Sequence, residues 1–362
     1  MRKLASLRTI EAVHPIDGAD RIEMVVIDGW QVVSQKGNFK AGDPCVYFEI
    51  DSIFPKDSVV GLSLPADKAG RYHTEENGYM DDVHRIKTIR LRGQISQGYA
   101  LPLTYFADYD VDLQAEDLTK ELGVLKYDKP ESTGGGMGYA AAAGNFPTTY
   151  IPKTNQERAQ NLKRTIYDHY VANTEFEVSV KLDGSSLTVG RVHENPEQEI
   201  KDYICSRNLS LKLDMEQDTS PFLFIGRPVL QNLVDKQMAN IAIQGELVAP
   251  NIQKNFEGVG KASLYVYSLW NVATQAYYSP TDAKEIVEGL GLNYVPLIAE
   301  RTTLRDLIGE VEDQNDLLAK LLAFADGPSG LNGKYREGLV YKSLDGKFSF
   351  KTISNKYLLK EA

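Results

Sequence analysis

The stretch EFEVSVKLDGSSLTVGRV (residues 175–192) decides the fold class of the second half of this chain. Apolar and polar residues alternate on both sides of Asp183-Gly184, which is the period of half-buried β-strands. Asp-Gly is typical of tight turns between strands, so the stretch predicts a strand, a turn and a second strand. Lys181 stands where the first strand ends, two residues before Asp183.

A lysine on an apolar strand beside a turn carboxylate is an unusual placement. Burying an ammonium group costs on the order of several kcal/mol unless the group is paired or loses its proton. Desolvation or nearby cations would lower the pKa of Lys181 and make it a nucleophile near neutral pH. The alternative is an exposed hairpin lysine, because a single Lys-x-Asp-Gly sequence occurs often by chance.

Regular elements are predicted on both sides of this stretch. Helical composition and charge spacing mark three segments: residues 155–171, 281–293 and 301–325. Strand-like runs lie within residues 237–250, 262–279 and 336–354. We therefore expect residues 148–362 to form an α+β domain with an antiparallel sheet.

The N-terminal residues 1–105 are dominated by short strand-like runs. Residues 21–37 predict two strands joined at Asp28-Gly29, residues 43–55 predict one more, and residues 86–103 predict two with turns at Gly93 and Gly98. Five short strands with glycine turns fit an OB-like β-barrel, and another small β-barrel would produce the same pattern.

Residues 106–147 lose this periodicity and predict a connector. Residues 106–132 hold 8 acidic and 3 basic residues, which is half of the net charge of the whole chain. The run STGGGMGYAAAAG (132–144) favours a mobile linker. A phosphate-binding loop is the alternative, but no Gly-Lys-Ser/Thr follows.

Composition sets limits on function. The 362 residues carry 40 Lys and Arg against 50 Asp and Glu, so the net charge of −10 argues against holding nucleic acid by charge alone. Two cysteines, Cys45 and Cys205, exclude a disulfide framework. Without a signal peptide or a run of about 18 apolar residues, we expect no membrane association and a cytoplasmic location, with the nucleus as an alternative.

Downstream of Lys181, further chemistry-bearing groups follow in a fixed order. They are Ser206-Arg207-Asn208, Gly245-Glu246-Leu247, LYVYSLWNV (264–272), REGLVYK (336–342) and FSFK (348–351). With KLDG, this series resembles the ordered motifs of the covalent nucleotidyltransferase superfamily, which contains RNA ligases, DNA ligases and mRNA-capping enzymes. The resemblance implies that residues 148–362 form an antiparallel-sheet nucleotidyltransferase domain of the ATP-grasp-like ligase kind.

Two features make the chain similar to the Deinococcus/Naegleria type of RNA ligase, RNA ligase family 5. DNA ligases and capping enzymes carry an OB domain after the last lysine motif, whereas 11 residues follow Lys351 here. The N-terminal barrel, PKTNQERAQN (152–161) and SFKTISNKYLLK (349–360) also resemble that family. One departure is Ser349, where related ligases often carry a lysine.

The resemblance implies an ATP-dependent RNA ligase that seals 3′-OH and 5′-phosphate ends, as in RNA repair. Lys181 would form lysyl-AMP, with Asp183 and Lys351 as the other catalytic residues, and Mg²⁺ or Mn²⁺ would be held by Glu246 and Glu337. Glu337 fits the metal more directly, whereas Glu246 fits either a water-mediated metal ligand or an acceptor for a ribose hydroxyl. The nucleotide-binding positions would be Arg158, Lys181, Gly184, Arg207, Glu246, Tyr265, Tyr267, Glu337 and Lys351. Which tyrosine stacks on adenine stays open, because both alternate onto one strand face.

RNA, in the form of a nicked duplex or a mixed RNA–DNA junction, is the expected partner, with no obligate protein partner. In the barrel, four cations without a nearby carboxylate would follow its phosphates: Arg85, Lys87, Arg90 and Arg92. A solvated strand face is the alternative for these four. Alternative functions are a DNA ligase, a capping-type guanylyltransferase, or an RNA-binding protein with a degenerate transferase domain.

Overall fold

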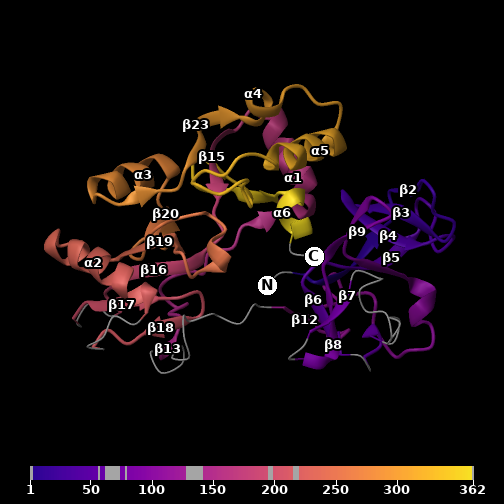
Figure 1. Cartoon of the computed structure of the whole chain (residues 1–362), viewed down its shortest axis with the longest axis horizontal. Coiled ribbons are helices and arrows are strands. Elements are labelled where there is room, and N and C mark those ends of the chain that lie inside the picture. Colours follow the sequence, from indigo (N-terminus) through magenta and orange to yellow (C-terminus); the bar gives the residue numbers. More distant parts are fainter. Residues whose placement is uncertain are drawn as a thin grey trace. The chain divides into compact units, whose positions relative to one another are not determined.

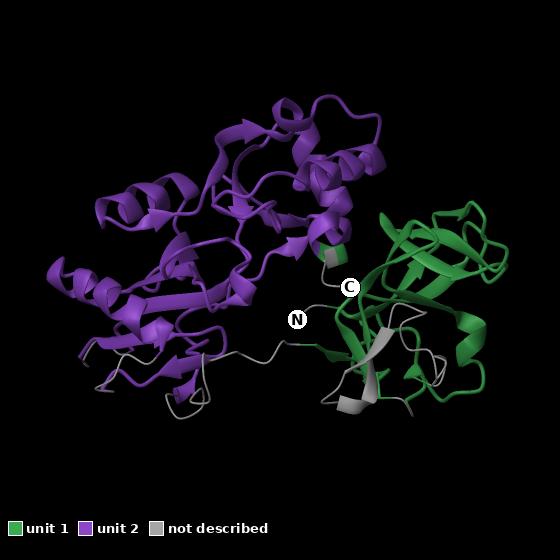
Figure 2. Cartoon of the chain, viewed as in Figure 1, with its two compact units in different colours: residues 1–130, 358–362 green, residues 131–357 purple. Residues whose placement is uncertain are grey.

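A computed structural model describes the chain over residues 3–55, 58–61, 74–77, 80–127, 142–194, 199–214 and 220–360. The chain forms two compact units, Met1–Pro130 with Leu358–Ala362 and Glu131–Tyr357 (Figure 2). The boundaries that we expected, 105 and 148, each lie inside one of these units. Most of the Gly/Ala run 132–144 lies outside the described residues.

The first unit consists of short strands (Figure 1). They are β1 (Ala5–Thr9), β2 (Ala12–Pro15), β3 (Ile22–Ile27), β4 (Trp30–Gln35), β5 (Pro44–Phe48), β6 (Ser52–Pro55), β7 (Thr74–Asn77), β8 (Met80–Ile86), β9 (Thr88–Leu91), β10 (Gln94–Gln97), β11 (Tyr99–Pro102) and β12 (Leu125–Lys126), with a 3₁₀ turn η2 (Leu103–Phe106). They pair as β1-β5-β11, β2-β3-β4, β9-β10 and β12-β6-β8-β7. Because β12 pairs with β6, part of the predicted connector belongs to this unit.

The hairpin predicted at Asp28-Gly29 is confirmed. β3 pairs with β4 with Ile27 opposite Trp30, and both turn residues have positive φ, 47° and 80°. Two such residues make the turn whose twist matches the strands. The strand predicted over 43–55 is divided into β5 and β6, because Asp51 at φ 71° interrupts it.

The second unit alternates strands and helices. Its elements are β13 (Ala142–Asn145), β14 (Glu157–Arg158), η3 (Ala159–Leu162), α1 (Lys163–Val171), β15 (Glu175–Lys181), β16 (Ser185–Val192), β17 (Lys201–Cys205), β18 (Leu209–Leu211), α2 (Pro221–Asp235), β19 (Ile241–Val248), η4 (Gln253–Asn255), β20 (Ser263–Asn271), β21 (Ala276–Tyr277), α3 (Pro280–Gly289), β22 (Asn293–Tyr294), β23 (Leu297–Thr303), α4 (Leu304–Ile308), α5 (Gln314–Ala325), β24 (Gly338–Ser343) and β25 (Ser349–Ile353). Helix α6 (Asn355–Lys360) follows. The expected α+β class with antiparallel sheet is confirmed.

Two sheets carry this unit. One has the order β13-β18-β17-β16-β19-β20-β21, with β22 beside β20, and the other has the order β14-β25-β24-β15-β23. β15 and β16 lie in different sheets, so the turn at Asp183-Gly184 passes the chain from one sheet to the other instead of closing a hairpin. A Cβ on Gly184 would lie 2.4 Å from the carbonyl oxygen of Leu247, so the crossing needs glycine.

Two helix predictions need correction, and one helix was not predicted. Residues 157–162 form β14 and η3 before α1 begins, because the segment pairs in parallel with β25. The first residues of 301–325 extend β23, which pairs with β15, and the helices there are α4 and α5. Helix α2 was not predicted, since Gly226 and Pro228 interrupt its pattern. No helix in the described part of the chain is long and apolar enough to cross a membrane.

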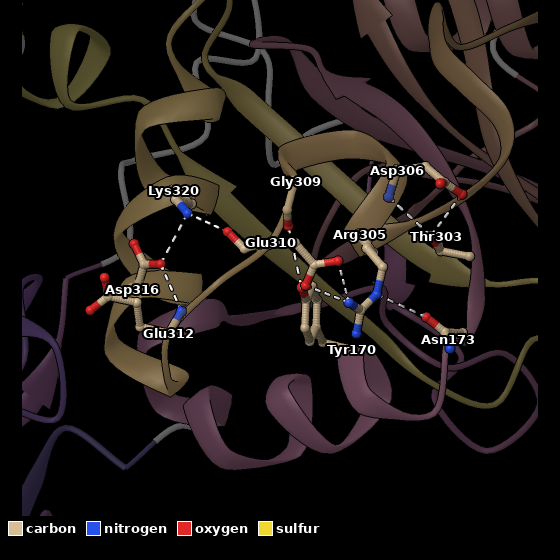
Figure 3. A network of polar contacts seen from close by, with 10 residues as sticks. All are labelled: Tyr170, Asn173, Thr303, Arg305, Asp306, Gly309, Glu310, Glu312, Asp316 and Lys320. Carbon is tan, nitrogen blue, oxygen red and sulfur yellow. Dashed lines mark hydrogen bonds and ion pairs between the residues drawn. The ribbon is translucent and has the colours of Figure 1, made fainter.

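The helices α1 and α5 support β15 from behind. Ile166 and Tyr170 of α1 and Leu317 of α5 join Val178 and Val180 of β15 in one buried cluster. At the surface end of α1, a polar network holds the loop between α4 and α5, as Figure 3 shows. There the Tyr170 hydroxyl donates to Glu310, and the Arg305 guanidinium pairs with the same carboxylate. The strand that ends at Lys181 is therefore packed against α1 and α5 through its buried face.

Candidate active site

Lys181 and Glu337 form the centre of the candidate site. The Lys181 Nζ donates to the Glu337 Oε2 at 2.6 Å. The register of β15 against β24 sets Lys181 opposite Gly338, so the residue before β24 comes beside the lysine. The side chains are 29% and 11% exposed, so the pair is largely shielded but reachable from solvent.

Two carboxylates, the half-buried Glu246 and the buried Glu257, hold the turn that follows Lys181. The Asp183 N–H donates to the Glu257 Oε1 at 2.8 Å, and the Gly184 N–H donates to the Glu246 Oε1 at 3.0 Å. Consecutive amides of the turn thus each have a carboxylate acceptor. Glu246 was a sequence candidate, whereas Glu257 was not.

The electrostatics of Lys181 differ from the expectation. Burial acts to lower the pKa of Lys181, but the surrounding carboxylates, Glu337 first, outweigh burial and raise it above its ordinary value. Without ATP the lysine is therefore an ammonium group, and the lowered pKa that we expected is not found. Burial also raises the pKa of Glu246 to about 8, with Lys181 opposing this shift and Glu337 adding to it.

Strand register gathers two further cations on the face of the sheet that carries Lys181. Lys351 lies opposite Val340 and Val340 opposite Ser179, two residues before Lys181. Side chains two apart on a strand share a face, so Lys351 projects to the same side as Lys181. Arg158 pairs with Lys351 in the parallel contact of β14 and β25, and it is 8% exposed.

Tyr267 lines a cavity between the two sheets of this unit. The cavity is small and open to solvent, and its walls include Gln156, Ser268, Lys342 and Phe348. The Tyr267 hydroxyl lies 3.0 Å from the Thr154 hydroxyl and 3.4 Å from that of Ser186. Tyr265 does not line the cavity, although it is on the same face of β20.

Arg207 lies in the connection between β17 and β18 and is exposed. Burial raises the pKa of Tyr267, the charge of Glu246 adds to this, and Arg207 opposes it. The positive charge of Arg207 therefore acts on the hydroxyl of Tyr267, the tyrosine that lines the cavity.

Lys342 is a further cation that the sequence did not single out. Its Nζ donates to the Ser268 hydroxyl at 3.0 Å and to the carbonyl of Tyr267, so it joins β24 to β20. Burial lowers the pKa of Lys342 to about 8, and Glu177 opposes the shift. Its position in REGLVYK was visible, but nothing in the pattern separated it from an ordinary strand lysine.

The four candidate RNA-binding cations of the first unit differ from one another. The Arg85 guanidinium pairs with Asp51 at 2.9 Å and lies 3.6 Å from the centre of the Tyr127 ring. Arg90 and Arg92 are exposed at the β9–β10 turn, and Lys87 is half-buried. Arg85 is thus engaged within the protein, whereas Arg90 and Arg92 reach solvent.

Carboxylate oxygens dominate the surroundings of Lys181. Glu246, Glu337 and Asp183 all act on its pKa, and such oxygens are the donors that Mg²⁺ and Mn²⁺ prefer. The donor chemistry therefore fits a divalent cation. In the described residues, no three or more His, Cys, Asp or Glu side chains converge into a closed metal site of their own.

Family models match both units. The model described as RNA ligase matches residues 174–358, and one described as an OB-fold domain matches residues 4–103. These matches cover the second unit's site and the first unit's strands. No curated protein matches the chain.

Solved structures of a Naegleria gruberi RNA ligase are similar over the whole chain. A substituted form with AMP and manganese is 34% identical, with a TM-score of 0.80 over 100% of this chain and 99% of that one. A second form, with ATP and manganese, is 34% identical with a TM-score of 0.79 over the same shares. A form without ligand is 33% identical with a TM-score of 0.81, again over 100% and 99%.

Proposed function

This chain belongs to the RNA ligase family, and from that premise we propose that it joins RNA 3′-OH and 5′-phosphate ends through a lysyl-AMP intermediate on Lys181. It is an ATP-dependent RNA ligase, with ATP and a divalent cation as cofactors. The observation that supports a lysyl-AMP intermediate is the ion pair between Lys181 and Glu337. It lies at the end of β15, where the chain passes from one sheet to the other.

The proposed reaction has three transfers. Lys181 first gives up its ammonium proton to solvent. The neutral Nζ then attacks the α-phosphorus of ATP, an N–P bond forms as the nitrogen loses a further proton to solvent, and the bond to the pyrophosphate oxygen breaks with its electron pair leaving on pyrophosphate. An RNA 5′-phosphate oxygen then attacks the same phosphorus and forms a P–O–P bond to AMP, while the N–P bond breaks and the lysine nitrogen takes up a proton from solvent as it leaves. Finally the RNA 3′-OH attacks the 5′-phosphorus, loses its proton and expels AMP.

Positive groups near Lys181 would neutralise the charge that builds up on phosphoryl oxygens. Lys351 shares a face with Lys181 and suits a contact with the α-phosphate, and Arg158 lies beside Lys351. Arg207 is exposed, which suits a contact with a phosphate or with the RNA end. Fixed donors aimed at developing charge are the largest single contribution in many enzymes.

Glu246 and Glu337 are our proposed residues for holding the divalent cation, with Asp183 close by. When bound, the cation would add positive charge at the phosphates. Glu337 has a second consequence, because it accepts from the Lys181 ammonium group and so keeps the nucleophile protonated until ATP arrives. Glu246 also accepts from the Gly184 amide and so fixes the turn.

We assign the ring that stacks on adenine to Tyr267 rather than Tyr265, because the Tyr267 hydroxyl contacts Ser186 in β16, the strand that follows the Lys181 turn. The ring is held by its hydroxyl contacts with Thr154 and Ser186, so it is fixed before a base arrives. A preformed aromatic wall loses little entropy on binding.

RNA is the substrate class that family membership implies. We propose a nicked duplex, with RNA–DNA junctions as a further substrate, and an intracellular location, where two buried free thiols such as Cys45 and Cys205 would stay reduced. The first unit would bind the RNA and the second unit would carry out the ATP chemistry.

The test of the intermediate is covalent labelling with α-labelled ATP. Lys181→Ala should abolish label that survives denaturation, whereas Lys254→Ala, which removes an exposed lysine, should label as the wild type does. Retained label on Lys181→Ala would refute the assignment of the nucleophile.

A further inference from the structure

Glu257 is a buried carboxylate that the proposed reaction does not use. It lies just after η4, in a segment without a strand or helix, and its exposure is 1%. Burying a carboxylate is costly unless its oxygens are hydrogen-bonded, so its partners show what it supports.

Both carboxylate oxygens of Glu257 are engaged, and each serves a different part of the site. Oε1 accepts the N–H of Asp183, in the turn that follows Lys181. Oε2 accepts the hydroxyl of Ser329, in the segment that leads to Glu337. The main chain adds a third contact, because the Asn332 N–H donates to the Glu257 carbonyl at 3.1 Å.

The backbones around these contacts are packed too closely to slide. A Cβ on Gly258 would lie 2.9 Å from the Asn332 carbonyl oxygen, and one on Gly333 would lie 2.7 Å from that of Phe256. The rings of Phe256 and Tyr335 pack edge to face, with 5.5 Å between the ring centres. Residues 256–258 are thus seated on residues 332–335, immediately before Glu337.

We propose that Glu257 is a positioning residue that fixes the Lys181 turn and the Glu337 segment to each other, and so sets the geometry of lysyl-AMP formation. The inference rests on the proposed function, because it assumes that Lys181 attacks ATP. Glu257 does not touch the reacting atoms. It acts through its hydrogen bonds to the Asp183 amide and the Ser329 hydroxyl. The property that matters is therefore the length of its side chain, which brings the oxygens within hydrogen-bond distance of both groups.

Reach and charge can be separated by two conservative variants. Glu257→Gln keeps an oxygen at the same distance for the Asp183 N–H, and its amide N–H can donate to the Ser329 hydroxyl. Glu257→Asp keeps the carboxylate but withdraws it by one methylene, about 1.5 Å, out of hydrogen-bond distance of the amide. A charge-based role, such as holding a metal ion, predicts the opposite order of activities.

The measurement is single-turnover label transfer from α-labelled ATP to the full-length protein at several ATP concentrations. We expect Glu257→Asp to lose about 30-fold or more of the saturating rate, with the half-saturating ATP concentration within about threefold of wild type. Glu257→Gln should stay within about threefold in both quantities. Ser329→Ala, which removes one of the two side-chain contacts, should fall between them.

A second readout does not depend on activity. Amide hydrogen exchange in a peptide that contains Asp183 should be faster in Glu257→Asp than in Glu257→Gln or the wild type. Equal exchange rates for the two variants would overturn the proposal. A Glu257→Asp variant that forms lysyl-AMP beside a Glu257→Gln variant that does not would also overturn it. Failure of the wild type to form lysyl-AMP would instead refute the proposed function, so the two failures are distinguishable.

Discussion

At the scale of single residues, the state of Lys181 decides when the enzyme can react. The pKa of Lys181 is raised by its carboxylate neighbours, with Glu337 the strongest of them, so the lysine is protonated at neutral pH. An ammonium group has no lone pair, so attack on ATP requires the minor neutral form. Below a lysine pKa, the neutral fraction rises about tenfold per pH unit.

We therefore expect lysyl-AMP formation at subsaturating ATP to accelerate with pH from about 6 to about 9, the range below a lysine pKa near or above its ordinary value. Single-turnover labelling at each pH measures this. A flat profile would mean that the free enzyme already holds Lys181 neutral, contrary to its carboxylate surroundings.

Glu337 has two effects that oppose each other, and a substitution separates them. Glu337→Gln removes the main group that raises the pKa of Lys181, so the rising limb of the pH profile should move to lower pH. The saturating rate should nevertheless fall about 100-fold or more, because a charge-stabilising group is lost. The unfolding midpoint of the variant is the control for the fold, and a rate within about threefold of wild type would remove Glu337 from the chemistry.

At the scale of elements, strand β20 offers two tyrosines on one face, and only Tyr267 lines the cavity. Tyr267→Ala should raise the half-saturating ATP concentration about tenfold, since base stacking on an aromatic ring is worth about 1–3 kcal/mol. Tyr267→Phe keeps the ring and should change it by less than about threefold. ATP titration of label transfer measures both, and a larger effect from Tyr265→Ala would assign the stacking ring to Tyr265.

The pairing of the strands also explains which parts of the fold could be predicted from the sequence. The alternation in residues 175–192 and the Asp183-Gly184 turn predicted two strands and their junction, because both are local patterns. The sequence could not show that these strands enter different sheets, since pairing depends on distant segments such as β24 and β19. For the same reason Glu257 left no signal, because its partners are 74 and 72 residues away in the chain.

At Glu157–Arg158 the strand pairing with β25 overrides the local preference for a helix. These residues stand in a helix-like composition but form β14, because pairing with β25 satisfies their backbone. The same pairing brings Arg158 beside Lys351, which a helix from residue 155 would not do. The order of the motifs along the sequence thus identified the candidate residues. That these residues share one face of the sheet follows only from the strand pairing.

At the scale of the whole molecule, each unit has its own buried core, so the proposed division of labour can be tested by separation. The cut should come before β13 rather than near residue 148, because β13 pairs with β18 and Phe146 is buried with Ile151 and Trp270. A fragment beginning at Glu131 keeps these contacts and all the residues assigned to ATP chemistry.

We expect this fragment to form lysyl-AMP and to seal nicked RNA poorly, because it lacks β9 and the β9–β10 turn, where Arg90 and Arg92 are exposed. In the full chain, replacing Arg90 and Arg92 with alanine should weaken RNA binding and reduce the slope of log affinity against log salt by about one to two. Arg85→Ala is a matched control, since Arg85 is held by Asp51 and Tyr127 and should leave that slope unchanged. Ligation of a labelled nicked duplex and salt titrations of binding provide the two readouts. If the fragment seals as fast as the intact enzyme, the first unit does not bind the substrate and its role is structural.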